Sequence, residues 1–305
     1  MCRVYKRGCI IEYPGKGDPL MKSTVFEEHT DGLAIDRVIR DYEFTMTTKH
    51  FHTECEIYYL LKGERYYFID KQTYLVKQGS LVFIDRRQIH KTSMAGQSYH
   101  DRILLEIDGE KIAPFTRLLG LDFYHFFEAH YGVLELDAGQ QRYVEELLAS
   151  IVAEIREKKV NYEAMVKMQV ASLLIYSLRC LKNQTFAPKG EEAQTAKHRK
   201  VHEVADYIIN NSGGSKSLED LAKRFYVSKC YLSRIFKEVT GSTVNEFINI
   251  QKIKQAQRLL SDTDHNITEI SEMLGYESIT YFEKVFKKYT ETSPLKYRKR
   301  QRTGR

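Results

Sequence analysis

The last third of the chain contains one pattern of residues twice, and this repeat constrains the fold more than any other feature. Leu218–Phe225 matches Ile267–Leu274 in its apolar positions at an offset of 49, and Ser228–Lys237 matches Ser278–Lys287 at an offset of 50. Each copy therefore predicts a short helix, a turn, and a second helix that begins with Ser. This layout is typical of the helix-turn-helix, whose second helix lies in the major groove of DNA.

Helix starts are marked by capping residues in the same region. Three of them stand three residues before a carboxylate, which is the spacing of a capping box: Ser217, Thr243 and Asn266. Ser293 precedes Pro294, and Pro is favoured at the first helical position. The helix expected from about Thr243 to Leu260 spans ~27 Å. With its flanking turns it can hold two recognition helices about one DNA turn, ~34 Å, apart.

The second helix of each copy has an apolar side and a polar side. Leu232 and Phe236 are four residues apart, as are Phe282 and Phe286 in the second copy, so these side chains face a small core. The remaining arc of the first copy holds Lys229, Cys230, Ser233, Arg234 and Lys237. A basic surface helix would show the same pattern, but two copies joined by one helix favour DNA binding.

The charge of the chain is unevenly distributed. Residues 198–305 hold 20 Lys and Arg against 13 Asp and Glu, whereas the rest of the chain holds 27 against 28. All the excess positive charge therefore lies in the last third, which suggests a polyanion-binding module attached to a neutral domain. A basic tail is the alternative, because four of these charges come from Lys299, Arg300, Arg302 and Arg305.

Residues 199–300 resemble the tandem helix-turn-helix domain of AraC/XylS-type bacterial transcription regulators. The resemblance is carried by LAxxFxVSxxYLSRxFKxxTG at Leu221–Gly241 and by GYESxxYFxxxFKKYTxxSPxxYR at Gly275–Arg298. Three positions depart from the family pattern. Val244 replaces a Pro and Ser271 replaces a small Ala, while Glu291 stands where Gly usually ends the helix, which disfavours a left-handed cap.

The resemblance also implies which side chains contact double-stranded DNA. On the first recognition helix these are Ser228, Lys229, Cys230, Ser233 and Arg234, and on the second Ser278, Ile279, Thr280, Glu283 and Lys284, with Lys237 and Lys287 near phosphates. Cys230 and Ile279 are poor hydrogen-bonding readers of bases. Base specificity is therefore expected to depend on few side chains and on DNA shape.

Residues 33–107 read as short strands separated by turn residues, which predicts an antiparallel sandwich or barrel. His50, His52, Glu56 and Gly63 have the spacing of the first cupin motif, and residues 79–90 resemble the second, with Asp85 and Arg87 in place of its Pro and Gly. We therefore expect residues 1–138 to form an N-terminal arm and a cupin-like, jelly-roll barrel.

The histidines of these motifs form a candidate effector site, which we assign to His50, His52, Glu56, Tyr58 and His90. His50, His52 and Glu56 are separated by even numbers of residues, so on one extended strand their side chains point to the same face. Three histidines and a carboxylate would also suit a transition metal, and a purely structural role is the third alternative. Tyr58, Tyr59, Tyr66 and Tyr67 offer stacking faces and hydroxyls, although a barrel core explains half of them equally well.

Residues 139–182 predict two amphipathic helices, which cover the barrel or pair with a second subunit. The first stripe is Val144, Leu147, Leu148, Ile151, Val152 and Ile155, and the second is Met165, Met168, Ser172, Ile175 and Leu178. Residues 183–197 have few large apolar side chains and are expected to be a linker before the DNA-binding domain at 198–305. Coupling between the halves is expected to pass through the helices or this linker.

These features together predict an α+β multidomain chain with a cupin-like sensor, a helical dimerisation pair and an all-α tandem helix-turn-helix domain. The expected function is sequence-specific transcription regulation controlled by a small, sugar-like or other effector, with a homodimer and RNA polymerase as partners and no cofactor, metal or membrane. A metal-dependent cupin enzyme fused to a DNA-binding domain is the alternative. Five scattered cysteines without a CxxC pair argue against a disulfide scaffold and fit a cytoplasmic protein.

Overall fold

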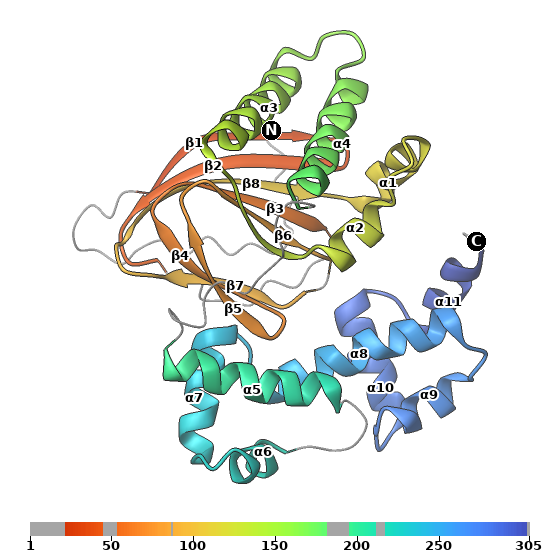
Figure 1. Cartoon of the computed structure of the whole chain (residues 1–305). Coiled ribbons are helices and arrows are strands. Elements are labelled where there is room, and N and C mark those ends of the chain that lie inside the picture. The colour runs from red at the N-terminus through yellow and green to blue at the C-terminus, as the bar shows by residue number, and fades with distance from the viewer. Residues whose placement is uncertain (1–21, 45–53, 87, 182–194, 212–216, 304–305) are drawn as a thin grey trace, which may run out of the picture.

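The computed structural model describes residues 22–44, 54–86, 88–181, 195–211 and 217–303. Figure 1 shows a β-region with helices over one side and the C-terminal helices against the other. All strand pairs are antiparallel. The strands are β1 Lys22–Thr30, β2 Leu33–Asp41, β3 Cys55–Lys62, β4 Glu64–Ile69, β5 Gln72–Lys77, β6 Ser80–Ile84, β7 His90–Met94, β8 Tyr99–Ile107 and β9 Gly132–Glu135.

The strands form two antiparallel sheets, so of the sandwich or barrel that the sequence predicts, the barrel is not closed. The first sheet has the order β1-β2-β8-β3-β6-β9 and the second β5-β4-β7, and no ladder joins them within the described residues. Gly63 forms the corner between β3 and β4, where the chain leaves one sheet for the other. Its φ is +95°, and a Cβ atom there would lie 2.4 Å from the carbonyl oxygen of Tyr99. The corner therefore requires glycine.

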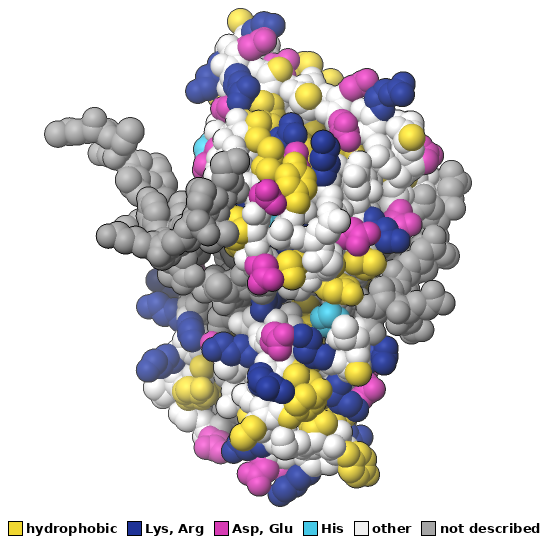
Figure 2. Space-filling view, turned by 90° about the vertical axis from the view of Figure 1, so that its left-hand side faces the viewer, with side chains coloured by type: hydrophobic (Ala, Val, Ile, Leu, Met, Phe, Trp, Pro, Cys, Tyr) yellow, Lys and Arg dark blue, Asp and Glu magenta, His cyan; other side chains and the backbone are white. Residues whose placement is uncertain are grey.

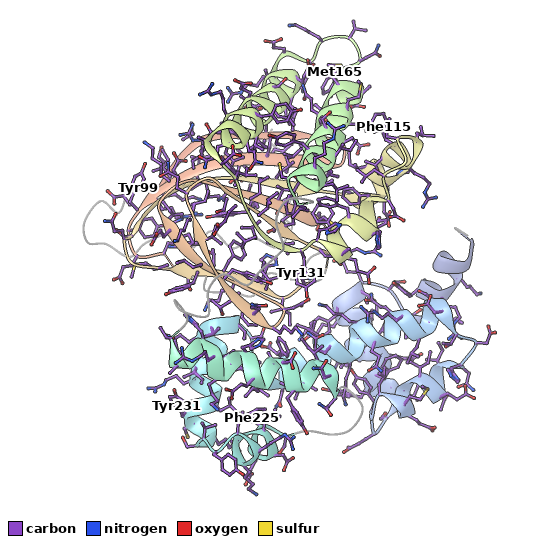
Figure 3. The ribbon with its side chains drawn as sticks, viewed as in Figure 1. Tyr99, Phe115, Tyr131, Met165, Phe225 and Tyr231 are labelled. Atoms are coloured by element: carbon purple, nitrogen blue, oxygen red, sulfur yellow. The ribbon has the colours of Figure 1, made fainter. Side chains whose placement is uncertain are left out.

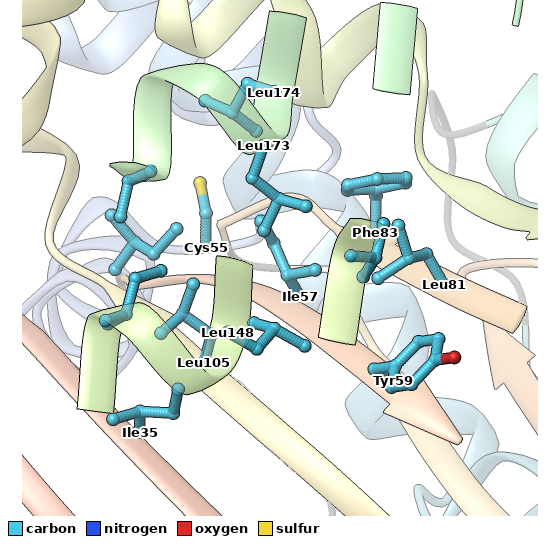
Figure 4. Close-up of a cluster of buried hydrophobic side chains, with 14 of the residues drawn as sticks. Ile35, Cys55, Ile57, Tyr59, Leu81, Phe83, Leu105, Leu148, Leu173 and Leu174 are labelled. Carbon is cyan, nitrogen blue, oxygen red and sulfur yellow. The ribbon is translucent and has the colours of Figure 1, made fainter. Parts of the chain in front are cut away.

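β3 is buried on both faces, which shows how the layers stack. Cys55, Ile57 and Tyr59 pack under the helices α1 to α4, in the cluster that Figure 4 shows. Tyr58 and Leu60 point the other way and share a second cluster with the three-stranded sheet. The helices over the six-stranded sheet are α1 Gly109–Leu118, α2 Phe123–Ala129, α3 Ala138–Glu157 and α4 Tyr162–Leu181.

The helix α3 buries the predicted stripe, whereas α4 does not. Val144, Leu148 and Ile151 of α3 are buried as expected. The buried residues of α4 are Val166, Gln169, Val170, Ala171, Leu173, Leu174, Ser177 and Cys180. Met165 and Met168 are instead 41% and 51% exposed, so the second predicted stripe lies on the outer side of the helix. α4 has the length and hydropathy of a membrane-crossing helix, but 39% of that stretch is buried and its inner side packs in the core.

The C-terminal helices follow the predicted starts. They are α5 Ala196–Asn210, α6 Leu218–Arg224, α7 Lys229–Thr240, α8 Val244–Asp262, α9 Ile267–Met273, α10 Ile279–Thr290 and α11 Pro294–Thr303. Capping boxes form at Ser217, Thr243 and Asn266, as the spacing predicts. The helix α8 contributes to both small cores, with Phe247 in the first and Ile253 in the second. Two helix-turn-helix units are therefore built on one shared helix.

The three departures from the family pattern fit into this framework. Val244 is the first residue of α8 and is buried, and Ser271 of α9 is buried as well. Glu291 adopts the left-handed conformation at the end of α10, with φ +59°, where its residue type disfavours that cap. The glycine-type cap therefore forms without glycine.

Candidate DNA-binding surface and sensor site

The first recognition helix, α7, presents one polar face to solvent. Ser228 caps the helix because its Oγ accepts a hydrogen bond from the backbone N–H of Tyr231, at 3.2 Å. Leu232 and Phe236 are fully buried, and this orientation turns the opposite arc outward. All the residues that the sequence assigns to DNA on this helix are exposed: Ser228, Lys229, Cys230, Ser233, Arg234 and Lys237.

The second recognition helix, α10, repeats this geometry. Ser278 caps it through the backbone N–H of Tyr281, and Phe282 and Phe286 are fully buried. The assigned residues are again all exposed: Ser278, Ile279, Thr280, Glu283, Lys284 and Lys287. Figure 2 shows that Lys and Arg side chains are frequent over the helical half of the face it draws. Both helices thus offer a solvent-facing arc with positive charge, as the major groove requires.

The predicted effector-site residues that the structure describes lie between the two sheets. Glu56 on β3 and His90 on β7 are both buried, with 3.5 Å between His90 Nε2 and Glu56 Oε2. The other ring nitrogen of His90, Nδ1, lies 3.0 Å from the carbonyl oxygen of Gln88. His50 and His52 lie outside the described residues. Among the residues that are described, no group of three His, Cys, Asp or Glu side chains is placed to hold a metal ion.

The four tyrosines noted in the sequence point in three directions, although only Tyr58 was assigned to the effector site. Tyr58 and Tyr67 lie between the sheets with their ring centroids 5.2 Å apart. Tyr59 faces the helices, where its hydroxyl donates to Glu145 at 2.7 Å, and burial and this bond raise its pKa. Tyr66 faces the C-terminal region and packs against the ring of His198. Alternation along β3 and β4 therefore leaves only Tyr58 and Tyr67 with the sensor residues.

Comparison with known proteins identifies both halves of the chain. A model of an AraC-like ligand-binding domain matches residues 33–170, and a model of a helix-turn-helix domain matches residues 221–300. The chain belongs to the AraC/XylS family. It is a DNA-binding transcription regulator with a ligand-binding domain.

Individual relatives and solved structures are similar to the chain over different shares of its length. An uncharacterized regulator of Bacillus subtilis, YfiF, is 25% identical over 83% of this chain and 79% of its own length. The xylose operon regulatory protein of Escherichia coli is 36% identical over 32% of this chain and 25% of its own length. Among solved structures, ToxT from Vibrio cholerae is 12% identical, with 88% of this chain and 98% of that chain covered and a TM-score of 0.36.

Sequence reasoning missed three exposed aromatic residues on or next to the two candidate recognition helices of this AraC/XylS-type regulator. Tyr231 and Tyr281 occupy the same position on α7 and α10 and are 37% and 53% exposed. Tyr226, in the turn before α7, is 96% exposed and has φ +54° (Figure 3 shows the neighbouring Phe225 and Tyr231). The recurrence of Tyr at one position of both copies was the available signal for the first pair.

The outer face of the three-stranded sheet contacts the first helix-turn-helix unit of the regulator directly. Phe68 of β4 and Ile89 are buried in the same cluster as the core of that unit. Lys71 Nζ lies 2.8 Å from Asp206 Oδ1 of α5, and Lys91 Nζ donates to the carbonyl oxygen of Glu238 in α7. The expected route through the helical pair or the linker is therefore not the only physical connection, because this sheet joins the two halves itself.

One series of polar contacts runs from the predicted effector site to α8. It begins with the 3.5 Å contact between His90 Nε2 and Glu56 Oε2, and the other ring nitrogen of His90 is hydrogen-bonded to the carbonyl group of Gln88. The side chain of Gln88 donates to Asp70 Oδ2 at 3.0 Å, and Lys254 Nζ of α8 donates to Asp70 Oδ1 at 2.7 Å. The helix that carries both DNA-binding units is thus hydrogen-bonded to the turn between β4 and β5.

Proposed function

We propose that this regulator binds a specific DNA sequence as a homodimer and that a small effector, bound between its two sheets, changes how it acts on transcription by RNA polymerase. The observation that carries this proposal is the pair of exposed recognition arcs on α7 and α10, built on one helix that also contacts the sensor region. Regulation of transcription by this mechanism would take place in the cytoplasm.

The two arcs are proposed to enter successive turns of the major groove. In the first arc, Arg234 contacts a base edge, because the guanidinium matches the acceptors of guanine. Each arc also has a lysine that contacts a phosphate, Lys237 in the first and Lys287 in the second. These lysines lie about one helical turn beyond Arg234 and Lys284. The exposed hydroxyls of Ser233 and Thr280 add hydrogen bonds, and Cys230 and Ile279 add apolar contacts.

The effector is proposed to act through Asp70. Glu56, Tyr58 and His90 line the space between the sheets, and the hydrogen bonds from His90 lead to Asp70 and Lys254. An effector that displaces His90 or Gln88 would therefore alter how α8 is held. Because a ligand shifts an equilibrium only by its different affinity for two states, α8 must have a second position relative to the sheet.

Dimerisation is proposed to use the outer side of α4. Met165 and Met168 are exposed there, Ile175 and Leu178 are half-buried, and Met165 lies toward the outer end of the helical pair (Figure 3). Met168→Glu should give monomers that keep the fold, because the residue is 51% exposed. Sedimentation velocity measures this, and a wild-type monomer at micromolar concentration would contradict the proposed homodimer.

Specific DNA binding is tested with the full-length protein and DNA selected from a random pool. The logarithm of the affinity should fall steeply with the logarithm of the salt concentration, by about 0.9 for each phosphate that is neutralised. Footprinting should show two protected major-groove segments about one helical turn apart. Equal affinity for selected and random DNA would contradict the proposal.

The coupling route is tested with Asp70→Asn and Lys254→Met. Once a thermal-shift screen has identified a ligand, both variants should bind it normally but lose the ligand-dependent change in DNA affinity. Lys111→Met is the matched control, because it breaks an exposed ion pair with Asp31 in the sensor region. A full response in both variants would show that the signal takes another route. Stoichiometric iron or manganese with a catalysed reaction would instead support a cupin enzyme.

A further inference from the structure

Two arginine side chains lie on the inner faces of the sheets, beside Tyr58. Arg40 comes from β2 and Arg65 from β4, and the side chain of Arg65 is fully buried. Both guanidinium groups lie against the ring of Phe44, with their central carbons 4.1 Å and 5.8 Å from its centroid. Two positive charges are therefore held next to each other inside the sandwich.

The hydrogen-bond partners of these two arginines are all uncharged. Arg65 donates through Nε to Thr92 Oγ1 at 3.2 Å and through Nη2 to the carbonyl oxygen of Phe44. Arg40 Nη1 lies 3.4 Å from His100 Nε2. Within the described part of the chain, Arg65 Nη1 and Arg40 Nε are buried without a hydrogen-bond partner. Neither arginine has a carboxylate partner there.

Arg102, which lies on the same inner face of the six-stranded sheet, shows what full compensation looks like. It is paired with Asp36, and that carboxylate raises the pKa of Arg102 despite burial. The pKa of Arg65 is instead lowered to about 10 by burial, with Arg40 contributing. Arg65 still carries its charge at neutral pH, so that charge is desolvated without an anion. Such a charge destabilises the fold unless something neutralises it.

Two other polar groups complete the arrangement without adding charge. Tyr58 is buried, and within the described residues its hydroxyl has no hydrogen-bond partner. Burial raises the pKa of Tyr58, so the hydroxyl keeps its proton and remains a donor. Burial and Arg65 lower the pKa of His100 to about 4, so this imidazole is neutral at pH 7. The site thus offers three unused donors, from β2, β3 and β4.

We propose that the effector is a small organic carboxylate, and that Arg40, Arg65 and Tyr58 bind its two oxygens between the sheets. An Arg guanidinium and a carboxylate form short, charge-assisted hydrogen bonds, which a sugar hydroxyl cannot replace because it leaves the positive charges uncompensated. The inference rests on the proposed function, since it names the class of molecule that the sensor region binds. It also narrows the effector expected from the sequence, sugar-like or other, to one chemical class.

The first experiment compares acids with their neutral amides on the full-length protein. Acetate and benzoate should raise the melting temperature and give saturable heats in calorimetry, whereas acetamide and benzamide at equal concentration and ionic strength should not. A ligand that binds only the folded state raises the melting temperature by mass action. Inorganic phosphate is the third probe. If phosphate binds more tightly than benzoate, or if neither acid binds better than its amide, the assignment to a carboxylate is wrong.

The second experiment changes the side chains. Arg65→Met and Arg40→Met should each weaken benzoate binding about tenfold to a hundredfold, as expected for the loss of a charged hydrogen bond. Tyr58→Phe should weaken it less. Arg156→Met is the control, because Arg156 pairs with Glu28 near the surface and should leave benzoate binding unchanged. Unchanged affinity in both the Arg65 and Arg40 variants would overturn the proposal.

The melting temperature of the unliganded variants separates binding from structure. Arg65→Met should melt at the same temperature as the wild type or higher, because it removes an uncompensated buried charge. Arg102→Met should melt much lower, because it leaves Asp36 unpaired. A large loss in Arg65→Met would mean that Arg65 is structural. If benzoate binds but does not change DNA affinity, the carboxylate site is supported and control by an effector bound there is contradicted. If only a neutral ligand changes DNA affinity, control by an effector is supported and the carboxylate assignment is wrong.

Discussion

The two helix-turn-helix units share their internal architecture but differ in what surrounds them. In the first, Thr240 Oγ1 donates to the carbonyl oxygen of Phe236 at 2.8 Å, and Thr290 repeats this bond to Phe286 at 2.8 Å in the second. The first unit, however, shares its hydrophobic cluster with Phe68 of the three-stranded sheet. The described members of the second cluster come from α8 to α11. The difference indicates that, among the described residues, the first copy makes the apolar contact with the ligand-binding domain, whereas the shared helix α8 contacts that domain through polar side chains such as Lys254.

The recognition arcs differ as well. Arg234 of the first unit corresponds to Lys284 of the second, and Ser233 corresponds to Glu283. Arg reads guanine through two parallel hydrogen bonds, whereas Lys acts as a point charge and a neighbouring carboxylate repels phosphate. We therefore expect the first unit to supply most of the base specificity and the second to add affinity.

The largest expected effect is a loss of stability that distinguishes the hydrophobic cores of the two helix-turn-helix units. Phe236→Ala and Phe286→Ala should each lower the free energy of unfolding of their unit by ~3–5 kcal/mol, because each removes a fully buried ring. Only Phe236→Ala should also speed hydrogen exchange in β4 and β7, because among the described residues only the first core includes Phe68 of β4 and Ile89, which precedes β7. Equal exchange in both variants would show that the units are coupled to the sheet to the same extent.

The next largest effect is on DNA affinity and distinguishes the recognition arcs of α7 and α10. Arg234→Ala should cost ~1–3 kcal/mol on the specific site and relax one base preference. Lys284→Ala should cost less and lower affinity for specific and random DNA by similar factors, as should Lys237→Ala. Affinities are measured at fixed salt on the selected site and on single-base variants. If Lys284→Ala relaxed a base preference as strongly as Arg234→Ala, the proposed division of roles would be wrong.

The sequence predicted the repeated part of the molecule better than the sensor part, for a physical reason. In the repeat, capping and helical periodicity are local, so Ser217, Thr243 and Asn266 mark helix starts without knowledge of distant contacts. In the sensor region, burial depends on which sheet a strand joins. The sequence left open whether the Met165 stripe covers the barrel or faces a second subunit, because both sides of α4 carry large apolar residues.

The sensor site shows the same limit. The parity of Glu56 and Tyr58 was predicted from β3 alone, and both do face the second sheet. Arg40 and Arg65 were not predicted, because they are far apart in sequence and meet only when β2 and β4 face each other across the sandwich. An arginine within an alternating strand normally marks the solvent side. Long-range packing, not local pattern, brings these charges inside.

A change of pH should loosen the first unit but not the second. His198 of α5 is buried against Tyr66, and burial and Lys197 lower its pKa, while Glu238 opposes the shift. The docked state therefore holds His198 neutral, and docking weakens as the pH falls below about 6.5, the ordinary value for His. Hydrogen exchange of α5 and α10 at pH 7.5 and pH 6.0 measures this. His198→Phe should abolish the difference in α5, and equal loosening of α10 would contradict the assignment.

The smallest expected effect concerns the C-terminal ends of α7 and α10, which adopt the same backbone conformation with different residues. Gly241 ends α7 with φ +76° and Glu291 ends α10 with φ +59°, so both adopt the left-handed conformation. A side chain makes that conformation less favourable by about 1 kcal/mol, and glycine does not. Glu291→Gly should therefore raise the free energy of unfolding of the second unit by up to about 1 kcal/mol, and Gly241→Ala should lower that of the first by a similar amount. Chemical denaturation of the full-length protein, followed by hydrogen exchange in α7 and α10, assigns each change to its unit. If Glu291→Gly were destabilising, the Glu291 side chain would be making a contact worth more than the strain of the backbone beneath it.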